Sequence, residues 1–214
     1  NSNDMNTIEH VDEILDAGVT SLKIEGRAKS AYYVAAMANA YKTAVNEYMV
    51  QRGFEDEHGG NLRPFHDQVH IPDDEPRPAT SVQFSPWLAH EPHKVTHRTY
   101  STGFYYPETP ASAEIKVGGY INEWLLVGIV DDYDVDAKRL YLHAKNKITP
   151  GSEIEFLFPG ESPVAYVVPP GGILDDAGDQ VSEINHPARQ FSIPCPRAIP
   201  AGAMIRARNP RHRG

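Results

Sequence analysis

The sequence predicts an α+β chain in which a helix–strand–helix unit comes first and a small antiparallel β domain follows. Over the first fifty residues, apolar side chains recur mostly at helical spacing, whereas beyond about residue 95 short apolar runs alternate with turn residues. A stretch rich in proline and acidic residues separates the two patterns. We therefore expect three segments, with boundaries at 1–53, 54–94 and 95–214.

The first segment has the pattern of one repeat of an α/β fold. Apolar spacing predicts a helix over 8–15, and Gly18 follows as a residue type that commonly ends helices. Residues 19–25 have the length and apolar content of a strand. Ser30 is placed to cap a second helix that runs to Gly53. The apolar stripe of this helix consists of Val34, Met37, Tyr41, Ala44, Val45 and Tyr48.

The predicted strand at 19–25 has no partner in this sequence, because one strand alone makes no parallel sheet. We therefore expect the chain to be part of a larger protein, whose remaining portion supplies the neighbouring strands. Without that portion, the strand and the apolar face of the second helix should fold onto the β domain, self-associate with a second copy, or fray. The sequence does not choose among these outcomes.

The middle segment predicts a long linker or insertion, because it combines acidic residues with prolines at positions 64, 72, 76, 78, 86 and 92. His66, Asp67 and His70 have the spacing of metal ligands, and His90 and His93 add donors. A proline-rich linker gives these side chains no rigid frame, so we expect no metal site in this chain.

The last segment predicts a small antiparallel barrel or sandwich, because its apolar runs are short and separated by turn signals. The runs are 124–130, 140–143, 154–158, 165–168, 191–193 and 204–205. A basic tail follows, made of Arg206, Arg208, Arg211, His212 and Arg213. We interpret it as a solvated end of the chain, with contact to RNA phosphates as the alternative.

Composition narrows the class of protein. With 40% hydrophobic and 23% charged residues and no run of about 18 apolar residues, the chain is expected to be globular and cytoplasmic, without a membrane partner. A net charge of −9 argues against a broadly basic nucleic-acid-binding surface but allows a local basic patch. The single cysteine, Cys195, excludes an intrachain disulfide and a self-contained iron–sulfur site.

Four sequence motifs resemble those of the peptidase U32 family, the collagenase-like peptidases. SLKIEGRAKSAYYVA at 21–35 resembles the family signature SLKIEGRMKSxYYVA. NSND at 1–4 resembles the family's NSKD, and HRTYSTGF at 97–104 resembles its HRxYxTGF stretch. Residues 145–155 resemble the KNxFxxGDxIE stretch of its C-terminal domain. The resemblance therefore reaches both ends of the chain.

The resemblance implies an architecture. Residues 1–53 would form the C-terminal end of a (β/α)8-type barrel whose earlier units lie upstream, and a small β-barrel domain would follow. Some relatives hold an iron–sulfur cluster on an upstream cysteine-containing segment, so no cofactor is expected within this chain itself. Ala28 replaces the usual Met of the signature, and 54–94 is longer and more acidic than the usual connection. The second departure leaves the relative placement of the two parts open.

Glu25 and Arg27 are the candidate catalytic residues. Chemistry in a βα barrel lies where strands end, and these residues close the predicted strand. Arg27 could hold an anion through two parallel hydrogen bonds, and Glu25 could take a proton or orient a ligand. The alternative is a structural ion pair of Glu25 with Arg27 or Lys23.

Four other basic residues, Lys23, Lys29, His97 and Arg98, are candidates for substrate binding. His97 and Arg98 could meet a phosphate of RNA or a small anion, or they could pack at a domain junction. Ser30 is better explained as a helix cap than as a nucleophile, because no His or Asp stands near it in a recognisable motif.

Three functions remain in competition. The resemblance is closest to the group that hydroxylates a uridine of tRNA with prephenate as co-substrate, which implies that the full-length protein modifies RNA and has tRNA as a partner. The family name implies peptide hydrolysis instead, although the sequence shows no serine, cysteine or zinc protease motif. A non-catalytic domain that binds RNA or protein is the third reading. In each case we expect this chain alone to be inactive.

Overall fold

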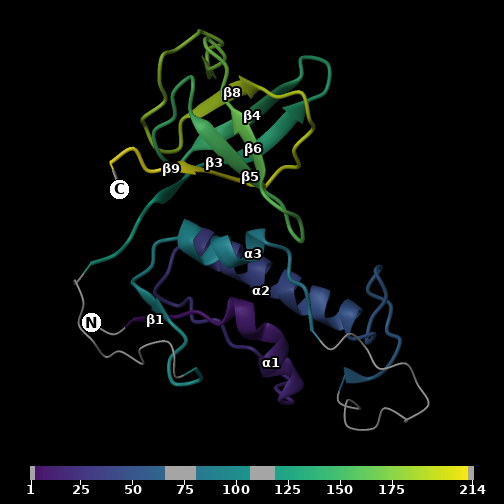
Figure 1. Ribbon diagram of the computed structural model, residues 1–214. Coiled ribbons are helices and arrows are strands. Elements are labelled where there is room, and N and C mark those ends of the chain that lie inside the picture. Colours follow the sequence, from purple (N-terminus) through teal and green to yellow (C-terminus); the bar gives the residue numbers. More distant parts are fainter. Residues whose placement is uncertain (1–2, 66–80, 107–118, 212–214) are drawn as a thin grey trace. The chain divides into compact units, whose positions relative to one another are not determined.

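The computed structural model describes residues 3–65, 81–106 and 119–211. The chain divides into two compact units, Asn1–Ile121 and Asn122–Gly214, which we call unit 1 and unit 2. Unit 1 carries the helices and unit 2 carries a curled β-sheet (Figure 1). None of the helices within the described ranges combines the length and the apolar character that a membrane span requires.

Unit 1 is built around one long helix, α2 (Ala31–Gln51). Its other elements are β1 (Asp4–Met5), η1 (Ile8–His10), α1 (Val11–Asp16), α3 (Trp87–His90), η3 (Glu91–Lys94) and β2 (Tyr100–Ser101). β1 and β2 pair in parallel, with Asp4 opposite Tyr100. This pairing brings the start of the chain beside a segment from the other end of unit 1.

Ser30 caps α2, as the sequence predicts. Its Oγ accepts a hydrogen bond from the backbone N–H of Tyr33 at 3.1 Å, which satisfies one of the N–H groups left open in the first helical turn. At the other end of α2, Gly53 adopts a φ of 70°, the left-handed conformation that commonly follows a helix. The capping interpretation of Ser30 is therefore confirmed.

The core of unit 1 joins α2 to the first helices and to the segment that follows α2. Its buried side chains are Ile8, Val11, Leu15, Ala40, Ala44, Tyr48, Phe54, Val82 and Leu88. Residues that we expected in a linker thus contribute to this core. Val34, which we assigned to the apolar stripe, is 43% exposed, and Ala36 lies on the buried face instead. Helical spacing alone does not show how much of a helix its neighbours cover.

Residues 19–25 do not form the strand that the sequence predicts. They run without regular secondary structure, and Val19 and Ile24 are each 37% exposed. A parallel strand must bond its backbone N–H and C=O groups to a neighbour, and no strand in the described part of the chain pairs with this segment. The strand prediction is therefore wrong for this chain.

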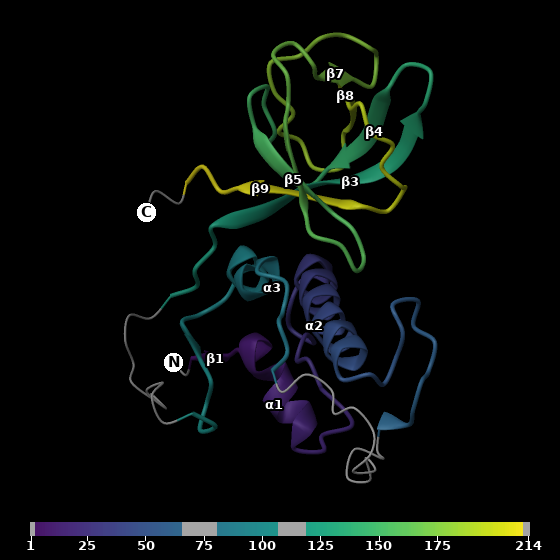
Figure 2. The same ribbon diagram turned by 45° about the vertical axis from the view of Figure 1, so that its right-hand side comes forward.

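Unit 2 is a seven-stranded antiparallel sheet that curls into a half-barrel (Figure 2). The strands are β3 (Trp124–Asp134), β4 (Arg139–Ala144), β5 (Glu153–Leu157), β6 (Val164–Val167), β7 (Leu174–Asp175), β8 (Gln190–Pro194) and β9 (Met204–Arg208). They lie in the order β6-β5-β9-β3-β4-β8-β7, so β6 and β7 form the edges. Each predicted run falls in a strand, which confirms the antiparallel β domain. β7, a strand of two residues, was not predicted.

One side chain of the predicted basic tail lies inside unit 2. Arg206, on β9, is fully buried, and its Nε and Nη2 donate to Glu155 Oε2 at 2.8 and 2.6 Å. Its guanidinium also lies 5.4 Å from the ring centroid of Trp124. The interpretation of Arg206 as part of a solvated end is therefore wrong, because β9 continues through it. Arg208 is exposed, and the last two residues of that tail lie outside the described ranges.

Candidate functional site

Unit 1 contains a cavity of about 480 Å³. It is lined by β1, by Ile14 of α1, by the irregular segment 19–25, by Lys29 and the first half of α2 as far as Tyr41, and by β2. Four of the predicted site residues, Lys23, Glu25, Lys29 and Arg98, contribute to its wall. The other two, Arg27 and His97, are not among its lining residues.

Asp4 organises the basic side of this cavity. Its Oδ1 accepts from Arg98 Nε at 2.9 Å and Nη2 at 2.6 Å, and its Oδ2 accepts from the backbone N–H of Arg98 at 3.0 Å. Lys29 Nζ lies 3.5 Å from the same Oδ2. Burial by itself raises the pKa of Asp4, but the hydrogen bonds from Arg98 and the charges of Lys29 and Arg98 outweigh it. The pKa of Asp4 therefore lies below its usual value of 3.8.

The two lysines add positive charge to the cavity. Lys29 directly precedes Ser30, the residue that caps α2. Its Nζ lies 4.9 Å from the ring centroid of Tyr33, within the range of a cation–π contact. Lys23 is exposed, and within the described residues it has no ion pair with an acid. With Arg98, the cavity carries three cations against the carboxylates of Asp4 and Glu25.

Glu25 and Arg27 form a local turn instead of an ion pair through their side chains. Glu25 Oε1 accepts from the backbone N–H of Arg27 at 2.8 Å, which closes the loop between 19–25 and α2. The Arg27 side chain is exposed. Glu25 therefore keeps one carboxylate oxygen beyond this bond and faces the cavity, whereas Arg27 stands on the same loop outside the cavity wall.

Four tyrosines form the aromatic side of the cavity: Tyr33, Tyr41, Tyr100 and Tyr105. Tyr41 accepts from the Thr7 backbone N–H at 3.0 Å and donates to Asn6 Oδ1 at 3.1 Å. Tyr100 donates to a backbone carbonyl at 2.7 Å. Burial is the main cause that raises the pKa of Tyr33 and of Tyr100. Tyr33 and Tyr100 therefore keep their hydroxyl protons at neutral pH.

His97 supports the wall of the cavity without lining it. Only 3% of it is exposed, and its ring stacks on Tyr100 with centroids 4.3 Å apart. Its Nδ1 lies 2.6 Å from the carbonyl oxygen of Arg98, which requires a proton on that nitrogen. The geometry favours a structural role for His97, since the ring packs behind Tyr100 and helps to hold it.

The described residues do not fit an iron–sulfur cluster or another metal centre. No group of three or more His, Cys, Asp or Glu side chains among them could hold a metal ion. His66, Asp67 and His70 lie outside the described residues. Cys195 is buried in unit 2, where its Sγ donates to the carbonyl of Arg197 at 3.1 Å and burial raises its pKa. A protonated, buried thiol is neither a cluster ligand nor a nucleophile.

Sequence reasoning found the cations of this cavity and missed most of its other members. Asp4 and Tyr100 lie inside the motifs NSND and HRTY, but the sequence alone assigns neither of them to a site. Tyr41 we had assigned to the core. The place of Asp4 and Tyr100 in these two motifs was the signal that could have found them. The pairing of β1 with β2 sets Asp4 opposite Tyr100 and so brings the two motifs together.

This arrangement fits the binding of an anion beside an aromatic or apolar group. The cations can hold a phosphate or a carboxylate through charge-assisted hydrogen bonds, and the Tyr33 hydroxyl can add a donor, whereas the Tyr41 and Tyr100 hydroxyls already donate within the protein. Glu25 is the carboxylate that remains available to accept a proton or to orient a polar group of the ligand.

Two family models match the chain. Peptidase family U32 matches residues 1–114, and the Peptidase family U32 C-terminal domain matches residues 122–206. The "tRNA hydroxylation protein P1" of Bacillus subtilis (strain 168) is 25% identical over 205 residues, which are 95% of this chain and 42% of that protein. The "tRNA hydroxylation protein P" of Escherichia coli (strain K12) is 44% identical over 55 residues, 26% of this chain and 12% of that protein. The chain thus spans less than half the length of these relatives.

Among solved structures, the C-terminal domain of a U32 peptidase from Geobacillus thermoleovorans is similar, with 25% identity and a TM-score of 0.36. The match covers 39% of this chain and 92% of that domain. The first family model covers more than half of the 214 residues, and the second covers most of unit 2. The chain therefore belongs to peptidase family U32.

Proposed function

We propose that the protein to which this chain belongs hydroxylates a uridine of tRNA, and that the cavity of unit 1 binds an anionic group of its substrates. The observation that carries this proposal is the similarity to the tRNA hydroxylation protein P1 of Bacillus subtilis, because it runs over 205 residues and both units. The relatives' names fit RNA modification and not peptide hydrolysis.

The contents of the cavity support this function. Lys23, Lys29 and Arg98 stand where a phosphate of RNA or the carboxylate of a small co-substrate would be held. Glu25 is then the residue that accepts a proton or orients the group to be modified. Arg27, exposed on the same loop, steers the anionic substrate toward the cavity. An RNA substrate is consistent with a reaction in the cytoplasm.

We also propose how this chain fits into the longer protein. Residues 1–53 are the C-terminal end of a (β/α)8-type barrel, whose other units belong to the rest of the longer protein. Two features support this. β1 and β2 pair in parallel, and the strand-length segment 19–25 lies unpaired between α1 and α2. In a complete barrel, 19–25 would bond to neighbouring strands, and Glu25 would stand at the carboxyl end where barrel enzymes place their chemistry.

The test is mass spectrometry of tRNA from cells that lack the full-length protein. Complementation with the wild type should restore the hydroxyuridine mass, and complementation with Glu25→Ala or Arg27→Ala should restore little of it. Leu62→Ala, at an exposed apolar side chain in the segment after α2, is the matched control and should behave as wild type. An unchanged tRNA on deletion would refute the function. Full restoration by Glu25→Ala would refute only the assignment of the site.

A further inference from the structure

Two aromatic side chains stand in solvent at the edge of the cavity. Phe104 is 94% exposed and Tyr105 is 68% exposed, and Tyr105 also lines the cavity with Lys23 and Lys29. Soluble proteins rarely hold a large apolar ring so far out of contact, and neighbouring exposed rings of this kind mark interaction surfaces.

The turn that carries these rings is anchored at its start. It follows β2, and the Tyr105 backbone N–H donates to the carbonyl of Thr102 at 3.4 Å. Gly103 adopts a φ of 67°, and a Cβ placed there would lie 3.3 Å from Met5 Sδ. A side chain at this position would be strained by the backbone and crowded by β1, so glycine permits the close approach.

The turn is anchored at its end as well. The ring of Tyr106 stacks on His10 with centroids 3.8 Å apart, and its hydroxyl donates to Glu13 Oε2 at 2.8 Å. Phe104 and Tyr105 therefore project from a segment that is held to β1 on one side and to α1 on the other. Binding to these rings therefore costs little conformational entropy, because the segment that carries them is already ordered.

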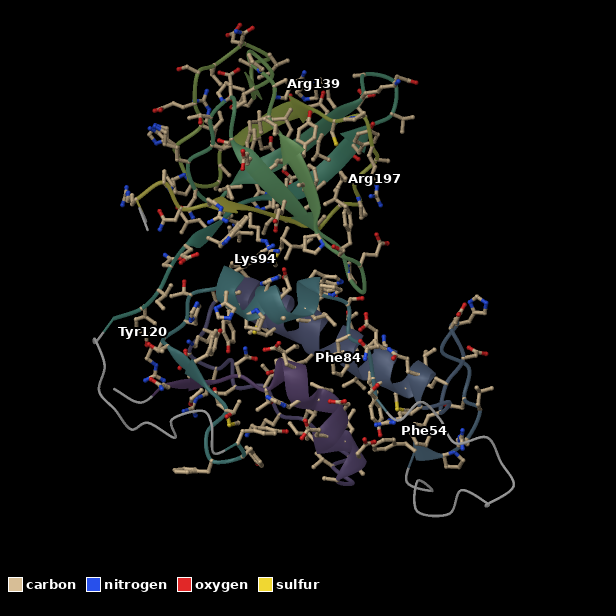
Figure 3. The ribbon with its side chains drawn as sticks, in the orientation of Figure 1. Phe54, Phe84, Lys94, Tyr120, Arg139 and Arg197 are labelled. Carbon is tan, nitrogen blue, oxygen red and sulfur yellow. The ribbon has the colours of Figure 1, made fainter. Side chains whose placement is uncertain are left out.

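Positive charge lies beside the rings. Lys29 Nζ is 5.5 Å from the ring centroid of Tyr120, a third aromatic residue, labelled in Figure 3, that is 67% exposed. Lys23 and Lys29 share the cavity wall with Tyr105, although the chain as a whole carries a net charge of −9. Exposed rings next to locally placed cations match the two parts of a nucleotide, a flat base and a phosphate.

We infer that Phe104 and Tyr105 stack on unpaired bases of the RNA substrate while Lys23 and Lys29 contact the adjacent phosphates. This inference rests on the proposed function and adds the mode of recognition. It selects single-stranded or looped RNA, because bases within a duplex do not offer their faces to a protein side chain. The alternative is that these rings pack against the remainder of the longer protein.

The test is RNA binding by the purified full-length protein, followed by fluorescence anisotropy with a labelled tRNA and with a fully paired RNA duplex. Phe104→Ala should weaken tRNA binding about tenfold. Phe104→Trp should bind as wild type, since it keeps a π-face, and Leu62→Ala is the control at another exposed apolar position. Phe104→Ala should leave both duplex binding and the slope of affinity against salt unchanged. Lys29→Ala should reduce that slope by about one.

Each outcome decides between the occupants. Unchanged tRNA affinity of Phe104→Ala would overturn the inference. If its melting temperature also falls, the ring packs against the rest of the protein instead of against RNA. Hydroxyuridine formation by the wild type, measured in parallel, tests the proposed function separately. Weakened binding in Phe104→Ala would support stacking even if the wild type forms no hydroxyuridine.

Discussion

Arg98 holds Asp4 from three donors, its backbone N–H and two guanidinium nitrogens, at 2.6 to 3.0 Å across 94 positions of the sequence. The two residues lie on or beside the paired strands β1 and β2, so this contact and the strand pairing support each other. The same contact fixes the guanidinium in the wall of the cavity. Stability of unit 1 and the shape of the candidate site are therefore coupled.

Arg98→Lys should lower the free energy of unfolding of unit 1 by about 2 kcal/mol, because a lysine keeps the charge and loses the planar fork. Urea denaturation can report on unit 1 through Trp87 fluorescence in a Trp124→Phe background, since these are the two tryptophans of the chain. Lys23→Arg, at an exposed position, is the control and should have little effect. Equal stability of Arg98→Lys and wild type would show that the fork geometry does not matter.

The ion pair also predicts how the stability of unit 1 depends on pH. The pKa of Asp4 is lowered in the folded state, so its contribution is present above the unfolded value and is lost as pH falls through the folded value. Wild-type unit 1 should lose stability below the usual Asp pKa of 3.8. Asp4→Asn should be less stable than wild type at pH 7 and should lose less on acidification. Parallel acid profiles for the two proteins would contradict this assignment.

Ser30→Ala should cost about 1 kcal/mol, because Oγ no longer accepts from the Tyr33 backbone N–H. Ser30→Asp is the matched variant and should retain the cap, since its carboxylate can accept the same bond and favours a helix N-terminus. Far-ultraviolet circular dichroism during urea denaturation measures both. If Ser30→Asp is as unstable as Ser30→Ala, the hydroxyl does something other than cap the helix.

In unit 2, Arg206→Met should destabilise by about 3 kcal/mol, because it leaves the Glu155 carboxylate without a fully buried partner. Glu155→Leu should be at least as costly, since it removes the carboxylate to which the fully buried guanidinium of Arg206 donates. The double variant should recover much of this loss, because two apolar side chains need no charge partner. Thermal unfolding of the three variants forms a double-mutant cycle, and strict additivity would show that the pair is not coupled.

Amide hydrogen exchange tests the barrel proposal. In this chain alone, the amides of 19–25 should exchange quickly, because no strand among the described residues pairs with them. In the full-length protein the same amides should be strongly protected, since neighbouring strands would bond them. The amides of α2 should be protected in both and serve as the reference. Fast exchange of 19–25 in the full-length protein would rule out a barrel strand there.

The sequence by itself determined most local structure. The Ser30 cap and the 3.6-residue period defined α2, and alternating apolar runs located the longer strands of unit 2. Such features depend on neighbours within a few residues, so they can be read from the sequence. The motifs at 21–35 and 97–104 also gave four members of the cavity wall, Lys23, Glu25, Lys29 and Arg98.

Only the tertiary structure decided which distant residues meet. Asp4 lies in the wall of the cavity because β1 pairs with β2, and His97 lies outside that wall, with its ring stacked on Tyr100. Arg206 is buried and not part of a solvated tail, because it lies on β9 and pairs with Glu155. The predicted strand at 19–25 failed for the same reason, since a strand exists only where a partner satisfies its backbone. Helix and strand propensities depend on residues close together in the sequence. Strand pairing and burial depend on contacts between residues that are far apart in the sequence, which local patterns do not reveal.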